Sequence, residues 1–195
     1  IRVNVITIFI HIFAGSIANV VVMVVVLILY TNIATRDIIS SPEHLAESKK
    51  IAQQSITVLR NESNILPINP SRYPKLTLVN LSDSEIGSPE SSFIRGVREY
   101  HPDVSYFEHD SRTTNSEELR IIRQARNSDL VVLGAFTLFR VRQDLQLNST
   151  QANFLRKLLA SRTPIVTVLF GNPYLINSIK QSEVQVIAWS NTSVQ

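Results

Sequence analysis

The sequence has 195 residues, of which 44% are hydrophobic, and it contains no cysteine. This length suits one ordinary globular domain with an appendage, and the lack of cysteine excludes disulfide bonds, thiolate metal sites and a cysteine nucleophile. The formal net charge of +3 comes from nineteen basic and sixteen acidic residues. Because these are spread along the chain rather than gathered in blocks, no nucleic-acid partner is expected.

The N-terminal stretch differs in composition from the rest of the chain. Between Val3 and Thr35, the only ionisable side chains are His11 and Tyr30. The window 5–30 is long enough for a membrane-spanning helix, which needs about 20 mainly apolar residues, but no signal-peptide charge cluster or cleavage site accompanies it. Three interpretations stay open: a membrane anchor, a buried apolar element, and a stretch foreign to the natural protein that arose from a misread frame or a gene-model error.

A helix is expected to begin at Ser41, because a hydroxyl residue, a proline and an acid follow one another there, as they do at helix N-termini. Apolar residues at helical spacing extend this predicted helix through Arg60. They are Leu45, Ala52, Ile56 and Leu59. The predicted helix ends in a polar run, RNESN, that passes directly into the apolar tetrad ILPI.

After this junction, short apolar runs alternate with amphipathic segments. The runs predict strands at 76–79, 104–107, 130–135, 165–170 and 184–189. The segments between them predict helices at 91–100, 116–125, 150–160 and, for a short one, 173–180. Strands that are apolar on both faces and separated by helices are typical of βαβ units. The predicted fold is therefore α/β: an open parallel-sheet sandwich with helices on both faces, Rossmann-like or flavodoxin-like, preceded by the apolar N-terminal segment.

Ligands of such sheets bind beyond the carboxyl ends of the strands. This rule selects the loops 80–84, 134–142, 171–174 and 190–192. In the second of these loops, Arg140 and Arg142 suit an anionic or polar ligand, and Asp144 follows shortly after. For the carboxylates of these loops, a solvated polar loop is the plainer interpretation.

Signature motifs of common α/β enzymes are missing from the sequence. The five glycines form neither GxGxxG nor a Walker phosphate loop, and no GxSxG is present. His44, His101 and His109 are too far apart along the chain for a local metal-ligand motif. The sequence therefore predicts no cofactor and no metal site.

The segment 46–68, AESKKIAQQSITVLRNESNILPI, resembles the junction that opens the C-terminal domain of glycoside hydrolase family 3. The positions that match the family pattern are Ala52, Ser55, Ile56, Leu59, Arg60, Asn61, Leu66 and Pro67. Two later stretches, NSDLVVLGAF and TPIVTVLFGNPYLI, are similar to pieces of the same domain and occur in the same order. The resemblance covers about residues 41–195.

Within that family, the run Asn172-Pro173-Tyr174 is more similar to the β-N-acetylhexosaminidase subgroup than to the β-glucosidases, whose acidic loop the stretch 136–147 does not match. The resemblance implies that the catalytic residues belong to a preceding (β/α)₈ barrel domain, which is missing here, so no residue of this chain is carried over as catalytic. The residues expected near the substrate of the intact enzyme are Gly134, Arg140, Arg142, Asp144, Asn172 and Tyr174.

The resemblance divides the chain into an apolar segment (1–40), a linker helix with the junction (41–74) and an α/β sandwich domain that is cut short at its C-terminus (75–195). A family member has a barrel helix and a linker before Ser41, so a misread frame or gene-model error becomes the favoured explanation of the apolar segment. The expected partners are the barrel domain and a glycan substrate, in a periplasmic, extracellular or membrane-associated location. The alternative is a membrane-anchored α/β ligand-binding or interaction module.

Overall fold

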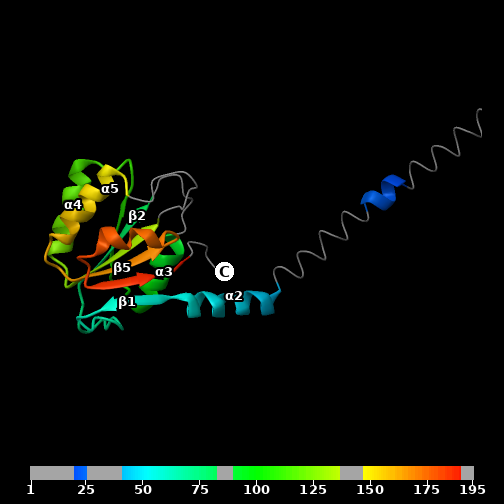
Figure 1. Cartoon of the computed structure of the whole chain (residues 1–195), viewed down its shortest axis with the longest axis horizontal. Helices are drawn as coiled ribbons and strands as arrows, with labels where there is room; N and C mark the ends of the chain where they lie inside the picture. Colours follow the sequence, from blue (N-terminus) through cyan, green and yellow to red (C-terminus); the bar gives the residue numbers. More distant parts are fainter. Residues whose placement is uncertain (1–19, 26–40, 83–89, 137–146, 190–195) are drawn as a thin grey trace, which may run out of the picture. The chain divides into compact units, whose positions relative to one another are not determined.

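The computed structural model describes residues 20–25, 41–82, 90–136 and 147–189 (Figure 1). The chain divides into two units between Lys50 and Ile51. Residues 20–25 are helical, and helix α2 (Pro42–Ser55) begins where the sequence predicts a helix start. In the part that the structure describes, no helix is both long enough and apolar enough to cross a membrane. The predicted span at 5–30 lies outside the described residues except for 20–25.

The second unit contains a six-stranded sheet. Its strands in chain order are β1 (Thr57–Asn61), β2 (Leu76–Ser82), β3 (Ser105–His109), β4 (Leu130–Phe136), β5 (Ile165–Phe170) and β6 (Val184–Ile187). Their order across the sheet is β1-β6-β5-β4-β2-β3. All neighbours are parallel except β1, which pairs antiparallel with β6. The predicted α/β class and its mainly parallel sheet are confirmed.

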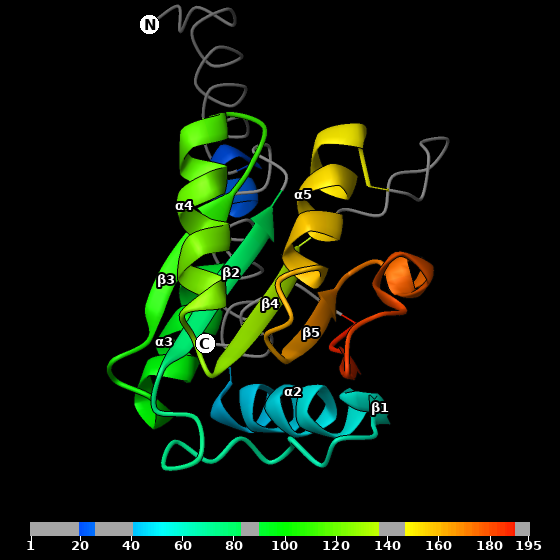
Figure 2. The ribbon, with the colours of Figure 1, turned by 90° about the vertical axis from the view of Figure 1, so that its left-hand side faces the viewer.

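Helices cover both faces of this sheet. They are α3 (Glu90–Tyr100), α4 (Asn115–Arg126), α5 (Ser149–Leu159) and the 3₁₀ helix η1 (Pro173–Ile179). Figure 2 shows α4 and α5 side by side in front of strands β2 and β4. The connection from β2 leads to the edge strand β3, whereas the connections from β3 to β4 and from β4 to β5 lead in the opposite direction across the sheet. Because such crossovers are right-handed, α3 lies on one face of the sheet and α4 and α5 lie on the other.

Strand β1 corrects one prediction. The helix predicted through Arg60 ends at Ser55, and Thr57–Asn61 forms an edge strand against β6. The helical spacing continues past Ser55, but the β-branched residues Ile56, Thr57 and Val58 favour an extended backbone. Pairing with β6 then satisfies the strand's polar groups, so a tertiary contact outweighs the local periodicity.

The core lies on both faces of the central strands. In β4, Val131 and Leu133 belong to the cluster beneath α4 and α5, whereas Leu130 and Val132 belong to the cluster that includes residues of α3. Every residue of β2 and β4 is buried. Fully burying one apolar side chain contributes about 1.5–3 kcal/mol, which explains why β4 appears in the sequence as a continuous apolar run. Strand β2 also buries the polar residues Thr77, Asn80 and Ser82.

The face that carries α3 contains an apolar groove of about 650 Å³. Among the described residues, α3 is the only helix on that face that connects two strands of the sheet. Parts of β4, β5 and β6 therefore remain uncovered there. The strand side chains in the groove are Val132, Val166, Val168, Phe170 and Val186, and its walls include Phe93, Val97, Ile56 and Val58.

The junction after β1 is built around the side chain of Asn61. Its Oδ1 accepts hydrogen bonds from the backbone N–H groups of Ile65 (3.0 Å) and Leu66 (3.1 Å), and its Nδ2 donates to the Leu66 carbonyl (3.2 Å). Ile65 is buried, with 2% of its surface exposed. Asn61, in the polar run RNESN of the junction motif, therefore fixes the turn that brings the ILPI tetrad back onto the sheet.

Changing Asn61 to alanine is expected to lower the free energy of unfolding by about 1–2 kcal/mol, because three partly buried backbone groups lose their partner. Asn61→Asp keeps the acceptor for both N–H groups, but its second oxygen replaces the amide donor and repels the Leu66 carbonyl. Its loss should still be smaller, because hydrogen bonds to a charged acceptor are stronger. Urea unfolding followed by circular dichroism measures both variants. Equal losses for the two variants would contradict the assigned role of Oδ1.

Candidate functional site

The carboxyl ends of β2, β3, β4 and β5 meet along one edge of the sheet, where the sequence predicts ligand contacts. The strand register aligns Ser82 with Phe136 and Phe136 with Phe170, and it aligns Leu81 with His109. These residues end their strands or, for Leu81, precede the end by one. The loops 83–89, 137–146 and 190–192, which leave this edge, lie outside the described residues.

Three of the six predicted substrate-proximal residues lie in the described part of the chain. Gly134 is inside β4 and buried. Asn172 caps η1, since its Oδ1 accepts a hydrogen bond from the N–H of Tyr174 at 3.0 Å, and it is 4% exposed. Tyr174 is 60% exposed. Arg140, Arg142 and Asp144 lie outside the described residues, so contact of the whole set with a substrate stays a prediction.

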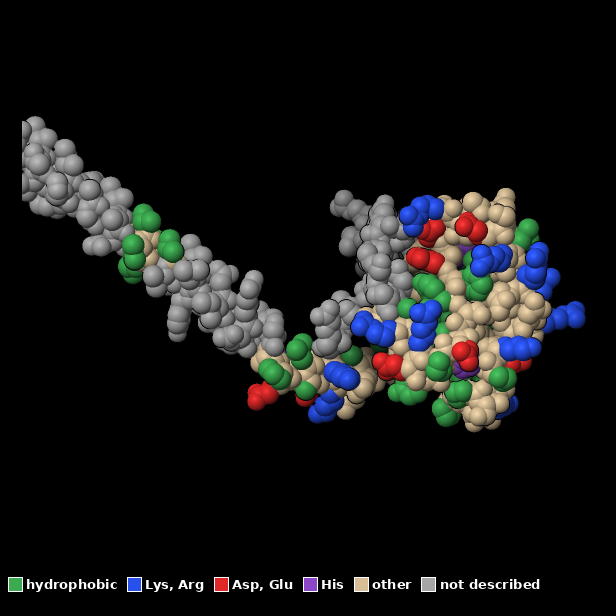
Figure 3. All heavy atoms as spheres, turned by 180° about the vertical axis from the view of Figure 1, so that it is seen from behind, with side chains coloured by type: hydrophobic (Ala, Val, Ile, Leu, Met, Phe, Trp, Pro, Cys, Tyr) green, Lys and Arg blue, Asp and Glu red, His purple; other side chains and the backbone are tan. Residues whose placement is uncertain are grey.

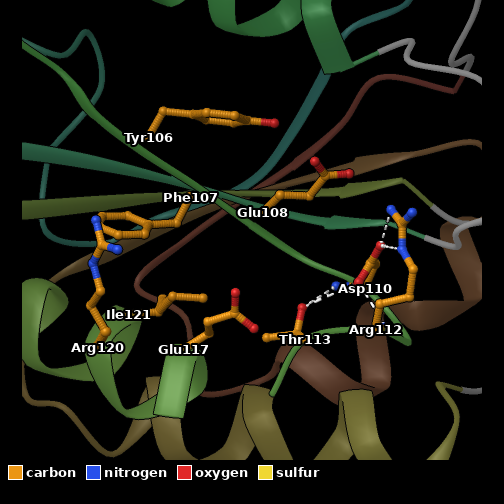
Figure 4. A pocket seen from close by; sticks show the side chains of 9 residues that line it. All are labelled: Tyr106, Phe107, Glu108, Asp110, Arg112, Thr113, Glu117, Arg120 and Ile121. Carbon is orange, nitrogen blue, oxygen red and sulfur yellow. Dashed lines mark hydrogen bonds and ion pairs between the residues drawn. The ribbon is translucent and has the colours of Figure 1, made fainter. Parts of the chain in front are cut away.

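A cleft of about 410 Å³ lies beside the edge strand β3, between its carboxyl end and the start of α4. Figure 4 shows Phe107 and Arg120 together at one end of this cleft, where the guanidinium lies 5.5 Å from the ring centre. Asp110, Arg112 and Thr113 lie at the other end. Sequence reasoning did not select Phe107, Asp110, Arg112 or Thr113, since they belong to the edge strand and its following turn. It interpreted Arg120 of α4, together with Arg123 and Arg126, as part of a solvated helix face.

The carboxylate of Asp110 holds this turn together. It accepts hydrogen bonds from the backbone N–H and the Nε of Arg112, both at 2.8 Å, and from the Thr113 hydroxyl at 3.3 Å. Burial raises the pKa of the Asp110 carboxyl, but the hydrogen bonds and the positive charge of Arg112 outweigh burial and hold that pKa below its usual range. Asp110 is therefore ionised and fully engaged in the turn.

Glu117 is engaged in the same way at the start of α4. Its Oε2 accepts hydrogen bonds from the backbone N–H (2.8 Å) and the hydroxyl (2.7 Å) of Thr114, whose hydroxyl in turn accepts from the Glu117 N–H. The hydrogen bonds from the Thr114 backbone and side chain lower the pKa of Glu117. This is a capping box, and its T-x-x-E spelling was visible in the sequence.

These carboxylates do not suit the role of the general acid in glycoside hydrolysis. A general acid of glycoside hydrolysis needs a raised pKa so that it carries a proton at neutral pH. The pKa values of Asp110 and Glu117 are shifted the opposite way, and Glu108 accepts a hydrogen bond from the Ser82 hydroxyl at 3.0 Å. The acidic residues that line the cleft therefore stabilise the local structure through their hydrogen bonds.

A buried histidine lies behind the cleft. His109 is 1% exposed, and its ring stacks on Phe154 of α5 with centres 3.9 Å apart. Beside it, Glu118 of α4 and Lys157 of α5 form an ion pair of 3.0 Å. In the sequence, His109 can be recognised only as an isolated histidine, because its partners belong to other segments of the chain.

The metal-ligating side chains and the surface charge of the described residues show which classes of ligand this part of the chain does not suit. The described residues hold no group of three His, Asp, Glu or Cys side chains that could bind a metal ion. Figure 3 shows Lys and Arg side chains spread over the face of the sheet unit seen from behind, with Asp and Glu between them. That face therefore presents no continuous basic patch of the kind that binds nucleic acid.

Comparison with known proteins gives consistent matches. No protein-family model matches the sequence. A curated protein, the beta-N-acetylglucosaminidase/beta-glucosidase of Cellulomonas fimi, is 30% identical over 80 residues, which cover 36% of this chain and 14% of that protein. The chain therefore spans a small part of this relative's length.

Solved structures match over most of the described domain. A fungal multi-domain family 3 β-N-acetylglucosaminidase has a TM-score of 0.64 and 20% identity, covering 79% of this chain and 17% of that one. The β-glucosidase from Listeria innocua in complex with isofagomine has a TM-score of 0.64 and 18% identity, with 80% and 24% covered. The β-glucoside phosphorylase BglX bound to 2FGlc has a TM-score of 0.60 and 18% identity, with 81% and 29% covered. These likenesses show the fold, and the resemblance that the junction motif indicates is confirmed.

Proposed function

We propose that this chain, which resembles part of the C-terminal α/β region of glycoside hydrolase family 3 in sequence and in fold, is a non-catalytic domain of such an enzyme. In this proposal the domain packs against a catalytic barrel and contributes loop contacts near the mouth of the barrel's active site. The barrel and the glycan are its partners, and the intact enzyme acts in carbohydrate or cell-wall glycan metabolism.

The observation that carries this proposal is the match to multi-domain glycosidases over about four fifths of this chain and less than a third of theirs. The described carboxylates agree with it. Asp110, Glu117 and Glu108 are all engaged in local hydrogen bonds, as described above. A supporting domain has no need of a proton-donating acid, so this arrangement suits it.

We further propose that the parent enzyme is a retaining exo-β-N-acetylhexosaminidase. Support comes from the run Asn172-Pro173-Tyr174, which is similar to that subgroup, and from the names of two relatives that include β-N-acetylglucosaminidase. Other relatives are named β-glucosidase and β-glucoside phosphorylase. In a retaining mechanism two carboxyl groups about 5 Å apart flank the scissile bond, and in this proposal the barrel supplies the catalytic groups.

The purified chain is expected to show no turnover of 4-nitrophenyl β-N-acetylglucosaminide or β-glucoside above the buffer blank. Circular dichroism must first show a folded α/β protein, so that inactivity is not a consequence of unfolding. The Cellulomonas fimi enzyme serves as the positive control. Turnover that Asp144→Asn abolishes would contradict the proposal, because it would place a catalytic acid in this chain.

A further inference from the structure

His109 occupies a site built from three elements. It ends β3, its ring lies on Phe154 of α5, and α4 follows it after the turn that Asp110 stabilises. The two rings are nearly parallel, with 15° between their planes. Among the described residues, the Nδ1 atom of His109 has no hydrogen-bond partner, although it is buried. The contact of His109 with Phe154 is therefore made by the flat face of the ring.

Three charged side chains act electrostatically on this ring. Glu118 of α4 and Asp110 of the turn are acidic, and Lys157 of α5 is basic. Glu118 is already paired with Lys157, and Asp110 is already held by Arg112. An imidazolium at this position would therefore bring a buried positive charge to a site whose acids have other partners, and such a charge is costly without one of its own.

We propose that His109 is an acid-sensitive element of the fold: its contact with α4 and α5 is maintained while the imidazole is neutral and loosens when the imidazole takes up a proton. The part affected is the cleft beside β3 and the helices that cover this face. The strands β5 and β6, on the other side of the sheet centre, do not contact the ring and keep their packing at first. This inference is independent of the proposed glycosidase role.

The direction of the pH effect follows from burial. Burial lowers the pKa of His109 below its ordinary value of 6.5, and Lys157 acts in the same direction. The carboxylates of Glu118 and Asp110 and a hydrogen bond with the backbone of His109 oppose this shift only in part. The unfolded chain takes up the proton near 6.5, whereas the folded chain does so at lower pH. The stabilising contribution is therefore complete above pH 6.5 and is lost as pH falls through the folded pKa. Within that window the folding equilibrium constant falls by up to about tenfold per pH unit.

The direct test is an NMR titration of the histidine rings in the intact 195-residue chain between pH 8 and 4.5. The His109 ring is expected to titrate below pH 6.5. Hydrogen exchange at pH 7 and pH 5, corrected for intrinsic rates, should show that amides of α4 and α5 lose protection before those of β5. A ring that titrates at or above 6.5 would overturn the proposal.

Variants test whether the titration controls stability. His109→Phe keeps a ring on Phe154 and removes the proton site, so its unfolding free energy should change less between pH 7 and 5 than that of the wild type. His109→Gln serves the same purpose if the phenylalanine variant does not fold. His44→Gln removes an exposed histidine of α2 and should keep the wild-type pH dependence. The same pH dependence in wild type and in a folded His109 variant would contradict the inference, and the wild-type titration decides the matter if neither variant folds.

Discussion

Replacing Phe154 with alanine is expected to lower the free energy of unfolding by about 3–5 kcal/mol, the range found when a buried aromatic ring is removed from a core. Phe154 lies on α5 with none of its surface exposed, in the cluster between that helix and the sheet. Its removal would leave a cavity that backbone elements on three sides cannot easily fill. The stacked ring of His109 would also lose its support.

Urea unfolding of the wild type and two control variants measures this effect. Phe154→Leu keeps most of the volume and should cost less than half as much. Leu119→Ala removes a side chain of α4 that is 62% exposed, and surface changes of this kind stay within about 0.5 kcal/mol. A loss for Phe154→Ala no larger than that of Leu119→Ala would contradict the packing described here.

The same variant links the core to the acid-sensitive histidine. Without the ring of Phe154, one face of the His109 ring loses its cover, and the burial that lowers the pKa of His109 is weakened. The His109 titration in Phe154→Ala should therefore move upward toward 6.5. The pH dependence of stability should become shallower at the same time, because the folded and unfolded chains then take up the proton at similar pH.

The central strands could be predicted because burial on both faces leaves a recognisable pattern in the sequence itself. Strands β2 and β4 are covered on both faces, so every position in them is buried. The sequence of β4 is a continuous apolar run, and the first four residues of β2 are mainly apolar. The edge strand β1 has no such signature. Val58 and Leu59 are about half exposed, and only the pairing with β6, more than a hundred residues later, fixes their conformation.

The site residues show the same limit. The capping box of Thr114 and Glu117 is local and could have been recognised from its spacing. The pair of His109 and Phe154 joins residues 45 positions apart, on a strand and a helix. No periodicity or motif connects them, since the contact depends on how α5 packs against the sheet that contains β3. Sequence reasoning therefore identified the elements but not this contact.

Changing Gly134 to alanine is expected to destabilise the domain by about 1–3 kcal/mol, as overpacking does in a filled core. Alanine is ordinarily more stable than glycine inside a strand by about 0.5–1 kcal/mol, so space decides the sign here. A Cβ at this position would lie 2.8 Å from the Oδ1 of Asn80 and 2.9 Å from ring atoms of both Phe93 and Phe136. Asn80 and Phe136 are fully enclosed, with 0% and 1% of their surface exposed, so they have little room to move, whereas Phe93 borders the apolar groove.

Gly96 of α3 provides the matched control, because a Cβ there meets nothing within 4 Å. Gly96→Ala should therefore raise the free energy of unfolding, by about 1 kcal/mol in a helix interior. A gain in both variants would show that the core around Gly134 is looser than described.

A double-mutant cycle with Asn80→Ala separates a packing role of Gly134 from its predicted place near a substrate. Asn80→Ala removes the closest atom, so Gly134→Ala should cost less in that background, with a coupling of about 1 kcal/mol, within the range for residues in contact. This coupling would arise without any glycan present. Finding it would show that the role of Gly134 is to allow the close packing of side chains between β2 and β4. Its absence would leave the position free for a role at the carboxyl edge of the sheet.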